Sequence, residues 1–187
     1  MKDKLAIFDL DGTLVDTCRA NYEAYKYAVD KVIGEWEISL GEFQTKCYGK
    51  NYKLFLKETG ITDSNAMIDI HKIKSYVYEK MLLEYGKENE FLIDLIQGVQ
   101  DKYNIAVVTT ASRENAMKAI SIFLQDINID FIVSAEDVKK LKPYTEGIEL
   151  VIRHFKCDTN NVVYFDDSAE SIELANRLGI TTYCVCL

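Results

Sequence analysis

The chain has 187 residues, of which 48% are hydrophobic and 28% are charged, and its net charge is −8. This length suits one core, or one core with a smaller second domain, and the composition is that of an ordinary globular protein. The negative charge disfavours a nucleic-acid partner, because a phosphate backbone is bound by clustered Lys and Arg. No apolar run approaches the roughly 18 residues of a membrane span, so no membrane partner is expected.

The N-terminal residues do not have the pattern of a secretory signal, because the short apolar segment that they lead into carries Asp9 and Asp11. The five cysteines are odd in number and irregularly spaced, which is typical of free thiols in a reducing cytosol. A cytoplasmic location is therefore expected. The sequence does not indicate an oligomeric state.

Five short, continuous apolar segments predict buried strands, at residues 5–8, 105–109, 131–133, 162–165 and 182–185. A continuous apolar run, without alternation, suits a parallel strand that is covered on both faces. Apolar residues at helical spacing precede the second strand and separate the later ones. We therefore expect an α/β fold with a doubly wound, parallel, Rossmann-like sheet of five strands.

One interval interrupts the alternation of strand and helix. About 75 residues separate the first strand from the helix near residue 90, far more than an ordinary connection between a strand and a helix. This interval shows helical patterns at residues 20–33, 50–58 and 65–85 and no convincing strand. We expect a helical domain at residues 16–85, inserted into a core made of residues 1–15 and 86–187.

Acidic residues follow two of the predicted strands. Asp9 and Asp11 come after the first strand, and Asp166 and Asp167 come after the fourth. Ligands of open parallel sheets bind beyond the carboxyl ends of the strands, so these four side chains are expected to converge. The alternative interpretation is that the acids cap helices or lie in surface turns.

Other polar residues are expected near the same crevice. Thr109 and Thr110 end the second strand, and Lys142 precedes the fourth strand with its helix between them. Four carboxylates and one ammonium group have a formal charge of −3, and such a cluster is unstable in a partly desolvated cleft without a cation or bound protons. Oxygen ligands of this kind favour a hard cation, and Mg²⁺ is the first choice.

Four segments in order resemble the signatures of the haloacid dehalogenase-like superfamily. They are residues 8–14 (FDLDGTL), residues 106–110 (AVVTT), Lys142-Pro143 and residues 165–168 (FDDS). The resemblance covers essentially the whole chain. The helical insert after the first segment is similar to the small cap domain of subfamily I, which includes phosphoglycolate phosphatases and β-phosphoglucomutase.

The resemblance implies a phosphatase that uses Mg²⁺. It implies that Asp9 attacks phosphorus to form an aspartyl-phosphate, and that Asp11 serves as general acid and then as general base. Thr109 would hydrogen-bond a phosphoryl oxygen, and Lys142 would neutralise charge on Asp9 and the phosphoryl group. It also implies a set of magnesium ligands: Asp9, the backbone carbonyl of Asp11, Asp166 and Asp167.

Two further residues are expected to help bind the substrate. Gly12 permits a sharp turn that a Cβ atom would hinder. The amide of Thr110 lies just ahead of the helix start at Ser112, where free N–H groups favour anions.

The resemblance also bears on the choice among family members. Dehalogenases lack the second acid of the first signature, whereas this chain has Asp11. Mutases similar to β-phosphoglucomutase carry a histidine where this chain has Asn21, which cannot act as an acid or base. A phosphatase acting on a small phosphorylated metabolite is therefore favoured, with a phosphomutase or a catalytically idle binding protein on the same fold as alternatives.

Substrate choice is expected to depend on the cap, and the segment at residues 47–52 is the best candidate there. Lys50 could bind an anionic leaving group and Tyr52 could stack on a ring. A solvated Lys50 after a helix break is an equally good interpretation.

Overall fold

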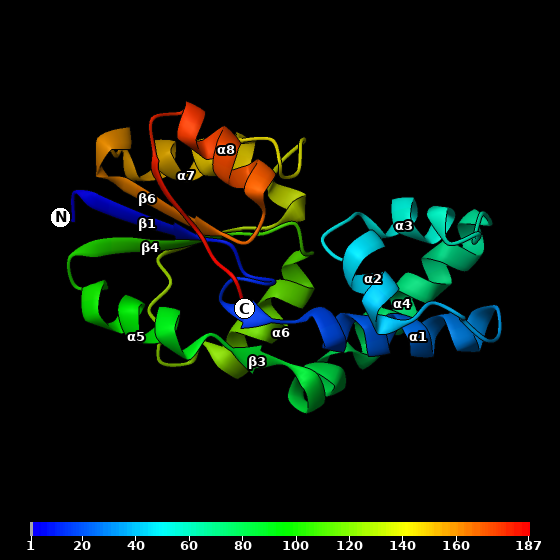
Figure 1. Ribbon diagram of the computed structural model, residues 1–187. Coiled ribbons are helices and arrows are strands. Elements are labelled where there is room, and N and C mark those ends of the chain that lie inside the picture. Colours follow the sequence, from blue (N-terminus) through cyan, green and yellow to red (C-terminus); the bar gives the residue numbers. More distant parts are fainter. Residues whose placement is uncertain (1) are drawn as a thin grey trace. The chain divides into compact units, whose positions relative to one another are not determined.

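The structure, a computed structural model, describes residues 2–187 (Figure 1). The chain divides into two compact units. Unit 1 comprises Met1–Asp16 and Glu88–Leu187, and unit 2 comprises Thr17–Lys87. Unit 2 is therefore an insertion between two parts of unit 1.

Unit 1 is built on a five-stranded sheet in the order β5-β4-β1-β6-β7. All four strand pairs are parallel. The strands are β1 (Lys4–Phe8), β4 (Tyr103–Val108), β5 (Phe131–Val133), β6 (Val162–Asp166) and β7 (Thr181–Cys184). The expected parallel sheet is confirmed, and each predicted strand lies within two residues of an observed one.

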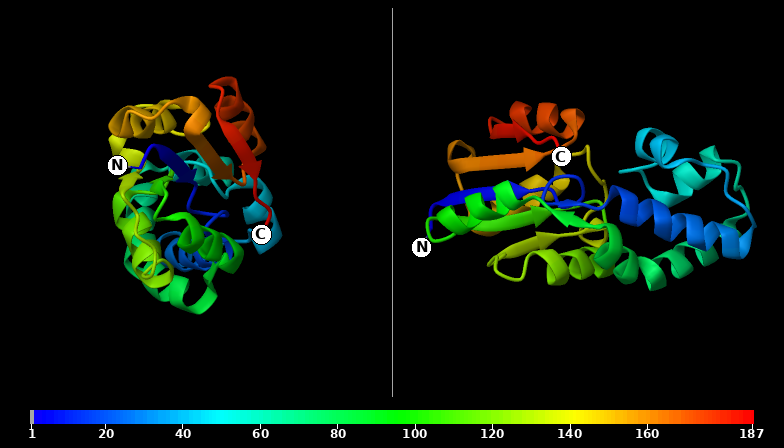
Figure 2. Two further views of the ribbon diagram at one scale, coloured as in Figure 1. Left: turned by 90° about the vertical axis from the view of Figure 1, so that its left-hand side faces the viewer. Right: turned by 60° about the horizontal axis from the view of Figure 1, so that its bottom comes forward.

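Helices cover both faces of this sheet, as Figures 1 and 2 show: α5 and α6 lie on one face, and α7 and α8 lie on the other. Their bounds are α5 (Glu90–Val99), α6 (Arg113–Phe123), α7 (Glu146–Phe155) and α8 (Ala169–Arg177). The side chains of Asn89, Ser112 and Ser168 cap the first turns of α5, α6 and α8 by accepting from backbone amides. Two 3-10 turns, η1 (Ala135–Asp137) and η2 (Thr159–Asn161), precede α7 and β6.

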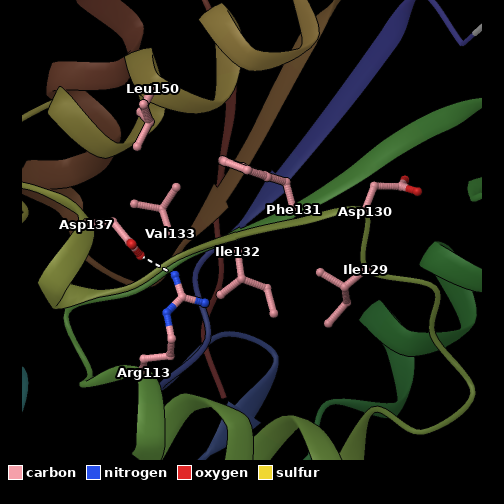
Figure 3. A pocket seen from close by; sticks show the side chains of 8 residues that line it. All are labelled: Arg113, Ile129, Asp130, Phe131, Ile132, Val133, Asp137 and Leu150. Atoms are coloured by element: carbon pink, nitrogen blue, oxygen red, sulfur yellow. Dashed lines mark hydrogen bonds and ion pairs between the residues drawn. The ribbon is translucent and has the colours of Figure 1, made fainter.

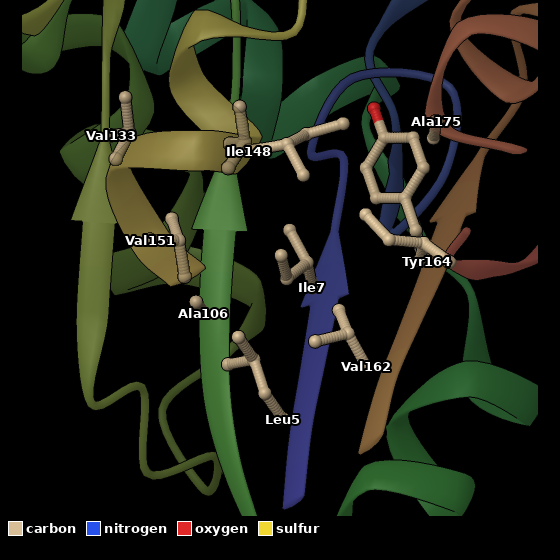
Figure 4. Packing of buried hydrophobic residues seen from close by; sticks show 11 residues of the cluster. Leu5, Ile7, Ala106, Val133, Ile148, Val151, Val162, Tyr164 and Ala175 are labelled. Carbon is tan, nitrogen blue, oxygen red and sulfur yellow. The ribbon is translucent and has the colours of Figure 1, made fainter. Parts of the chain in front are cut away.

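One hydrophobic core cluster of unit 1 lies between the sheet and the α7–α8 layer (Figure 4). Leu5 and Ile7 of β1, Val108 of β4 and Val151 of α7 are all almost fully buried there. Because both faces of the central strands are covered, their apolar runs are continuous. With both faces of the sheet covered by helices, polar side chains can gather at the carboxyl ends of the strands.

Unit 2 consists of four helices: α1 (Cys18–Val32), α2 (Leu40–Lys46), α3 (Tyr52–Glu58) and α4 (Ser64–Tyr85). The long helices α1 and α4 pack along each other. A second, largely aromatic core includes Tyr25, Trp36, Phe43 and Phe55. Unit 2 thus has its own hydrophobic core.

Two helix predictions in this unit need correction. Helix α2 was missed, because its seven residues are too few for a clear period, although Ser39 and Glu42 form a capping box at its start. The helix expected at residues 50–58 begins at Tyr52, because the Asn51 side chain accepts from the amide of Lys53 and caps it.

Two very short strands were also missed. β2 (Val15–Asp16) and β3 (Lys87–Glu88) form a two-stranded sheet of their own, and two residues carry no readable alternation. Among residues 2–187, no helix combines the length and the apolar character that crossing a membrane requires.

Candidate active site

Asp9 follows the last residue of β1 directly. Its backbone amide donates to the carbonyl oxygen of Phe165 at 2.9 Å, which continues the pairing of β1 with β6 by one residue. The side chain is only 5% exposed. Strand pairing therefore holds this carboxylate at the carboxyl end of the sheet.

Asp166, the last residue of β6, is fully buried beside it. Its Oδ1 atom accepts from the backbone amide of Ser168 at 2.7 Å. Its Oδ2 atom accepts from the ammonium group of Lys142 at 2.9 Å and from the hydroxyl of Tyr164. Both oxygens of this carboxylate are therefore hydrogen-bonded to protein donors.

Lys142 joins the two acids. Its Nζ atom donates to Oδ1 of Asp9 as well as to Oδ2 of Asp166, and its side chain is only 12% exposed. Burial alone would lower the pKa of Lys142, but the charges of Asp9 and Asp166 outweigh it and raise the pKa above its ordinary value. The lysine therefore remains an ammonium group at neutral pH.

Asp9 is electrostatically strained. Burial raises its pKa to about 7, with Lys142 opposing this shift and the charges of Asp166 and Asp11 adding to it. Among residues 2–187, no donor reaches Oδ2 of Asp9, although this atom is buried. An unsatisfied buried carboxylate oxygen is rare and indicates a missing positive group or donor.

Asp167 completes an acidic cluster. One carboxylate oxygen from each of Asp9, Asp166 and Asp167 lies within 4.8 Å of the others, and Asp167 is the exposed member. Burial of part of its carboxyl group and the charge of Asp166 raise the pKa of Asp167. Three carboxylates beside one ammonium group retain a net negative charge, and this oxygen-only donor set fits Mg²⁺.

Gly12 lies against this cluster. Its φ of +90° belongs to the region that favours glycine, and a Cβ atom at this position would overlap the carboxylate of Asp167. The turn after β1 therefore leaves room for the Asp167 carboxylate that a side chain at position 12 would take.

Asp11 and Thr109 also meet. The hydroxyl of Thr109 donates to Oδ2 of Asp11 at 3.2 Å and accepts from the amide of Ala111 at 3.0 Å. Thr110 follows it, is partly buried and precedes Ser112, whose side chain caps α6 as expected. The structure thus gathers Asp9, Asp11, Gly12, Thr109, Lys142, Asp166 and Asp167 at the carboxyl ends of β1, β4 and β6.

Sequence reasoning missed Tyr164, whose hydroxyl hydrogen-bonds Asp166. Residues two apart in a strand share a face, so the period of β6 could have indicated it. The tyrosine was instead counted as part of an apolar run, because a buried phenol and a buried apolar side chain give the same pattern.

The two residues proposed for the cap lie in unit 2 and have partners there. Nζ of Lys50 lies 2.9 Å from Oε2 of Glu58. The ring of Tyr52 stacks on that of His71 at 4.1 Å between centroids. Within unit 2, each of these side chains thus has a structural contact.

A pocket of about 360 Å³ lies elsewhere in unit 1, along the edge strand β5 (Figure 3). Its charged lining residues are already engaged. Arg113 pairs with Asp137 at 2.6 Å, and Asp130 pairs with Lys2 at 3.5 Å. None of the acids of the cluster lines this pocket, so it is separate from the candidate active site.

Several proteins of known name are similar in sequence to this chain. The pyrophosphatase PpaX of Halalkalibacterium halodurans is 25% identical over 197 residues, which cover 99% of this chain and 84% of that protein. The phosphorylated carbohydrates phosphatase of Thermotoga maritima is 26% identical over 181 residues, which cover 93% of this chain and 81% of that protein.

The fold has known counterparts as well. CbbY from Rhodobacter sphaeroides, solved in complex with phosphate, superimposes with a TM-score of 0.82 at 20% identity, covering 97% of this chain and 85% of that one. The sequence profile described as haloacid dehalogenase-like hydrolase matches residues 6–185, nearly the whole chain. This chain therefore belongs to the haloacid dehalogenase-like hydrolase family, which confirms the family resemblance and the class of enzyme expected from its motifs.

Proposed function

We propose that this protein is a Mg²⁺-dependent phosphatase that hydrolyses a small phosphorylated metabolite through an aspartyl-phosphate on Asp9. The observation that carries the proposal is the surroundings of the two carboxylate oxygens of Asp9. Lys142 holds one of its carboxylate oxygens, while the other is buried without a donor beside two more carboxylates. Such an oxygen atom can bind a cation or attack an electrophile.

The donor set agrees with the metal that the resemblance implies. Asp9, Asp166, Asp167 and the backbone carbonyl of Asp11 would hold Mg²⁺. When bound, the ion would reduce the repulsion between the phosphate and the Asp9 carboxylate. Lys142 supplies the remaining positive charge from the protein itself.

The chain's own residues account for both steps of hydrolysis. A carboxylate oxygen of Asp9 bonds to phosphorus as the bond to the leaving oxygen breaks, and Asp11 gives its proton to that oxygen. In the second step Asp11 takes a proton from water, the water oxygen bonds to phosphorus, and the bond to Asp9 breaks. The Thr109 hydroxyl now donates its one proton to Asp11, and it would have to turn that proton toward a phosphoryl oxygen when the substrate binds.

The substrate class follows from the named relatives. One is a pyrophosphatase and another a phosphatase of phosphorylated carbohydrates, so pyrophosphate and sugar phosphates are the first candidates for this chain. Lys50 and Tyr52 remain predictions as substrate contacts, and each would have to exchange its present partner for the substrate. Gly12 and Thr110 remain predicted substrate-binding residues, near the phosphate group. The cytoplasm remains the predicted location.

A phosphomutase is the less favoured alternative. It needs an acid–base group where this chain has Asn21. The Asn21 amide donates to the backbone oxygen and the hydroxyl of Thr17 and to the hydroxyl of Tyr78, all within unit 2. A carboxamide does not ionise near neutral pH, so Asn21 cannot transfer the proton that a mutase must move.

The test is phosphate release from pyrophosphate and a panel of sugar phosphates, with Mg²⁺ and with chelator. We expect Mg²⁺-dependent release by the wild type and a loss of at least a thousandfold in Asp9→Asn, because the amide is not nucleophilic. Asp126→Asn is the matched control, since Asp126 is exposed in the same unit. It should retain full activity.

Two outcomes would contradict the proposal. Substantial turnover by a folded Asp9→Asn variant would remove Asp9 as the nucleophile. No release from any ester by the wild type would favour the catalytically idle binding protein.

A further inference from the structure

Tyr164 is a buried phenol that the proposed reaction does not use. It lies in the middle of β6, is fully buried, and its ring packs among Ile148, Val162 and Ala175 of the unit 1 core. Figure 4 shows the ring among these apolar side chains with its hydroxyl directed toward the carboxyl ends of the strands. The hydroxyl donates to Oδ2 of Asp166, which lies two residues further along the same face of the strand.

The oxygen that accepts from Tyr164, Oδ2 of Asp166, also accepts from Lys142. The other oxygen, Oδ1, is taken by the amide of Ser168. A chain of hydrogen bonds thus runs from the hydrophobic core to the proposed nucleophile, in the order Tyr164, Asp166, Lys142 and Asp9. The Asp166 carboxylate, with donors on both oxygens, is the fixed member through which the other groups of this buried network are placed.

The Tyr164 hydroxyl affects the position of the Lys142 ammonium group between the carboxylates of Asp166 and Asp9. Without the hydroxyl, Oδ2 of Asp166 would lose one of its two donors in a site that water does not reach. The ammonium group would then be drawn toward Asp166 and away from Asp9, because an under-satisfied buried carboxylate attracts its remaining donor more strongly. Asp9 would retain less of the positive charge that its reaction with an anionic phosphate requires.

We propose that Tyr164 is a positioning residue that acts through Asp166 to hold Lys142 against Asp9. It need not touch the substrate. This inference rests on the proposed function for its catalytic consequence, but the arrangement itself can be tested without turnover.

The first experiment is a double-mutant cycle of Tyr164→Phe and Lys142→Met, measured by urea unfolding in chelator. If Tyr164 holds Lys142 through Asp166, the two substitutions are coupled. We then expect the unfolding equilibrium constant of the double variant to differ at least fivefold from the value that independent effects would give. Additive effects would overturn the proposal, whether or not the protein is an enzyme.

The second experiment measures the catalytic consequence. In Tyr164→Phe we expect kcat to fall about tenfold with KM within twofold of wild type, because the substitution misplaces a group that acts on the reacting centre. Tyr183→Phe is the matched control. Tyr183 lies on the adjacent strand β7, is half-exposed and stacks on Phe165, away from the chain of hydrogen bonds.

The outcomes separate the two proposals. An unchanged kcat in a folded Tyr164→Phe variant of an active enzyme, or the same loss in Tyr183→Phe, would overturn the positioning role. A wild type without phosphatase activity would overturn the proposed function, and the double-mutant cycle would still decide whether Tyr164 holds Lys142.

Discussion

At the residue scale, burial and the ion pair with Lys142 have opposite effects on the pKa of the Asp9 carboxyl group. Burial raises its pKa to about 7, which disfavours the charged form, and Lys142 partly offsets this. The protein therefore carries a destabilising feature at the carboxyl end of the sheet. Such strain is common where function requires a reactive group, and here it concerns the residue proposed to attack phosphorus.

Gly12 allows a prediction at the same scale. A Gly12→Ala substitution should be destabilising by about 1–2 kcal/mol, which is the cost of a positive φ for a residue with a Cβ atom, and the new atom should displace the Asp167 carboxylate. It should weaken Mg²⁺ binding as well, since Asp167 is a proposed ligand. Chemical unfolding and calorimetric Mg²⁺ titration would measure the two effects.

Gly179→Ala is the matched control for this prediction. Gly179 has a φ of +78°, but the nearest atom to its added Cβ would be Oγ1 of Thr159 at 3.8 Å, which is an ordinary contact. This variant should show the backbone effect alone and bind Mg²⁺ normally. Equal behaviour of the two variants would mean that the close approach of Gly12 to Asp167 has no consequence.

At the element scale, helix ends and helix packing position the site. Ser112 and Ser168 begin α6 and α8 immediately after strands β4 and β6. These caps end the loops that carry Thr109 and Asp167. Helix α7, which begins four residues after Lys142, packs on β1, β4 and β5.

Two helical glycines give a prediction with opposite signs. In Gly98→Ala the new Cβ atom meets nothing within 4 Å, so the higher helix propensity of alanine should stabilise α5 by up to about 1 kcal/mol. In Gly147→Ala the same atom would lie 2.8 Å from Cγ1 of Val108, a buried β-branched residue with little freedom to move. We expect a net loss of about 1–3 kcal/mol.

Urea unfolding of both variants would check this pair. A stabilised Gly147→Ala variant would show that α7 can shift away from β4 at little cost. A change in activity of Gly147→Ala would show that the packing of α7 on Val108 affects the placement of Lys142, which precedes α7, or of Thr109, which follows Val108.

At the scale of the whole molecule, each unit contains a hydrophobic cluster of its own. The cluster of unit 1 is mainly aliphatic and lies on the sheet, whereas that of unit 2 is rich in aromatic residues and includes Trp36, the single tryptophan. Trp36 fluorescence therefore reports on unit 2, and hydrogen exchange in β1 and β4 reports on unit 1.

Magnesium should stabilise unit 1 more than unit 2, because all the proposed ligands belong to unit 1. At a Mg²⁺ concentration 100 times Kd, linkage predicts a gain of about 2.7 kcal/mol. Hydrogen exchange in β1 and β4 should slow accordingly, while the urea midpoint of Trp36 fluorescence should move less. Asp167→Asn should remove the effect.

Equal shifts in both probes would show instead that the two units unfold as one. No slowing of exchange in unit 1 at high Mg²⁺ would contradict the metal site itself. Calcium at the same concentration is a useful comparison, since its larger radius and higher coordination number suit this small donor set less well.

Much of the architecture was predictable because it depends on local patterns. Continuous apolar runs identified the strands of the parallel sheet, and polar residues at their ends identified where the site would form. The weaker signals failed for a physical reason: α2 and the two-residue strands β2 and β3 are too short to show a period.

The sequence by itself thus determined the class of fold, the family and the acids that gather at the sheet edge. Only the tertiary structure decided how those acids are paired, because Lys142 and Asp9 are 133 positions apart and their contact depends on packing between them. It also decided that Tyr164 donates a hydrogen bond to Asp166 and that Lys50 pairs with Glu58. One oxygen of Asp9 has no donor among residues 2–187, which the sequence does not indicate either. Hydrophobic periods report which face of an element is buried, but only the folded chain brings a particular donor to a particular acceptor.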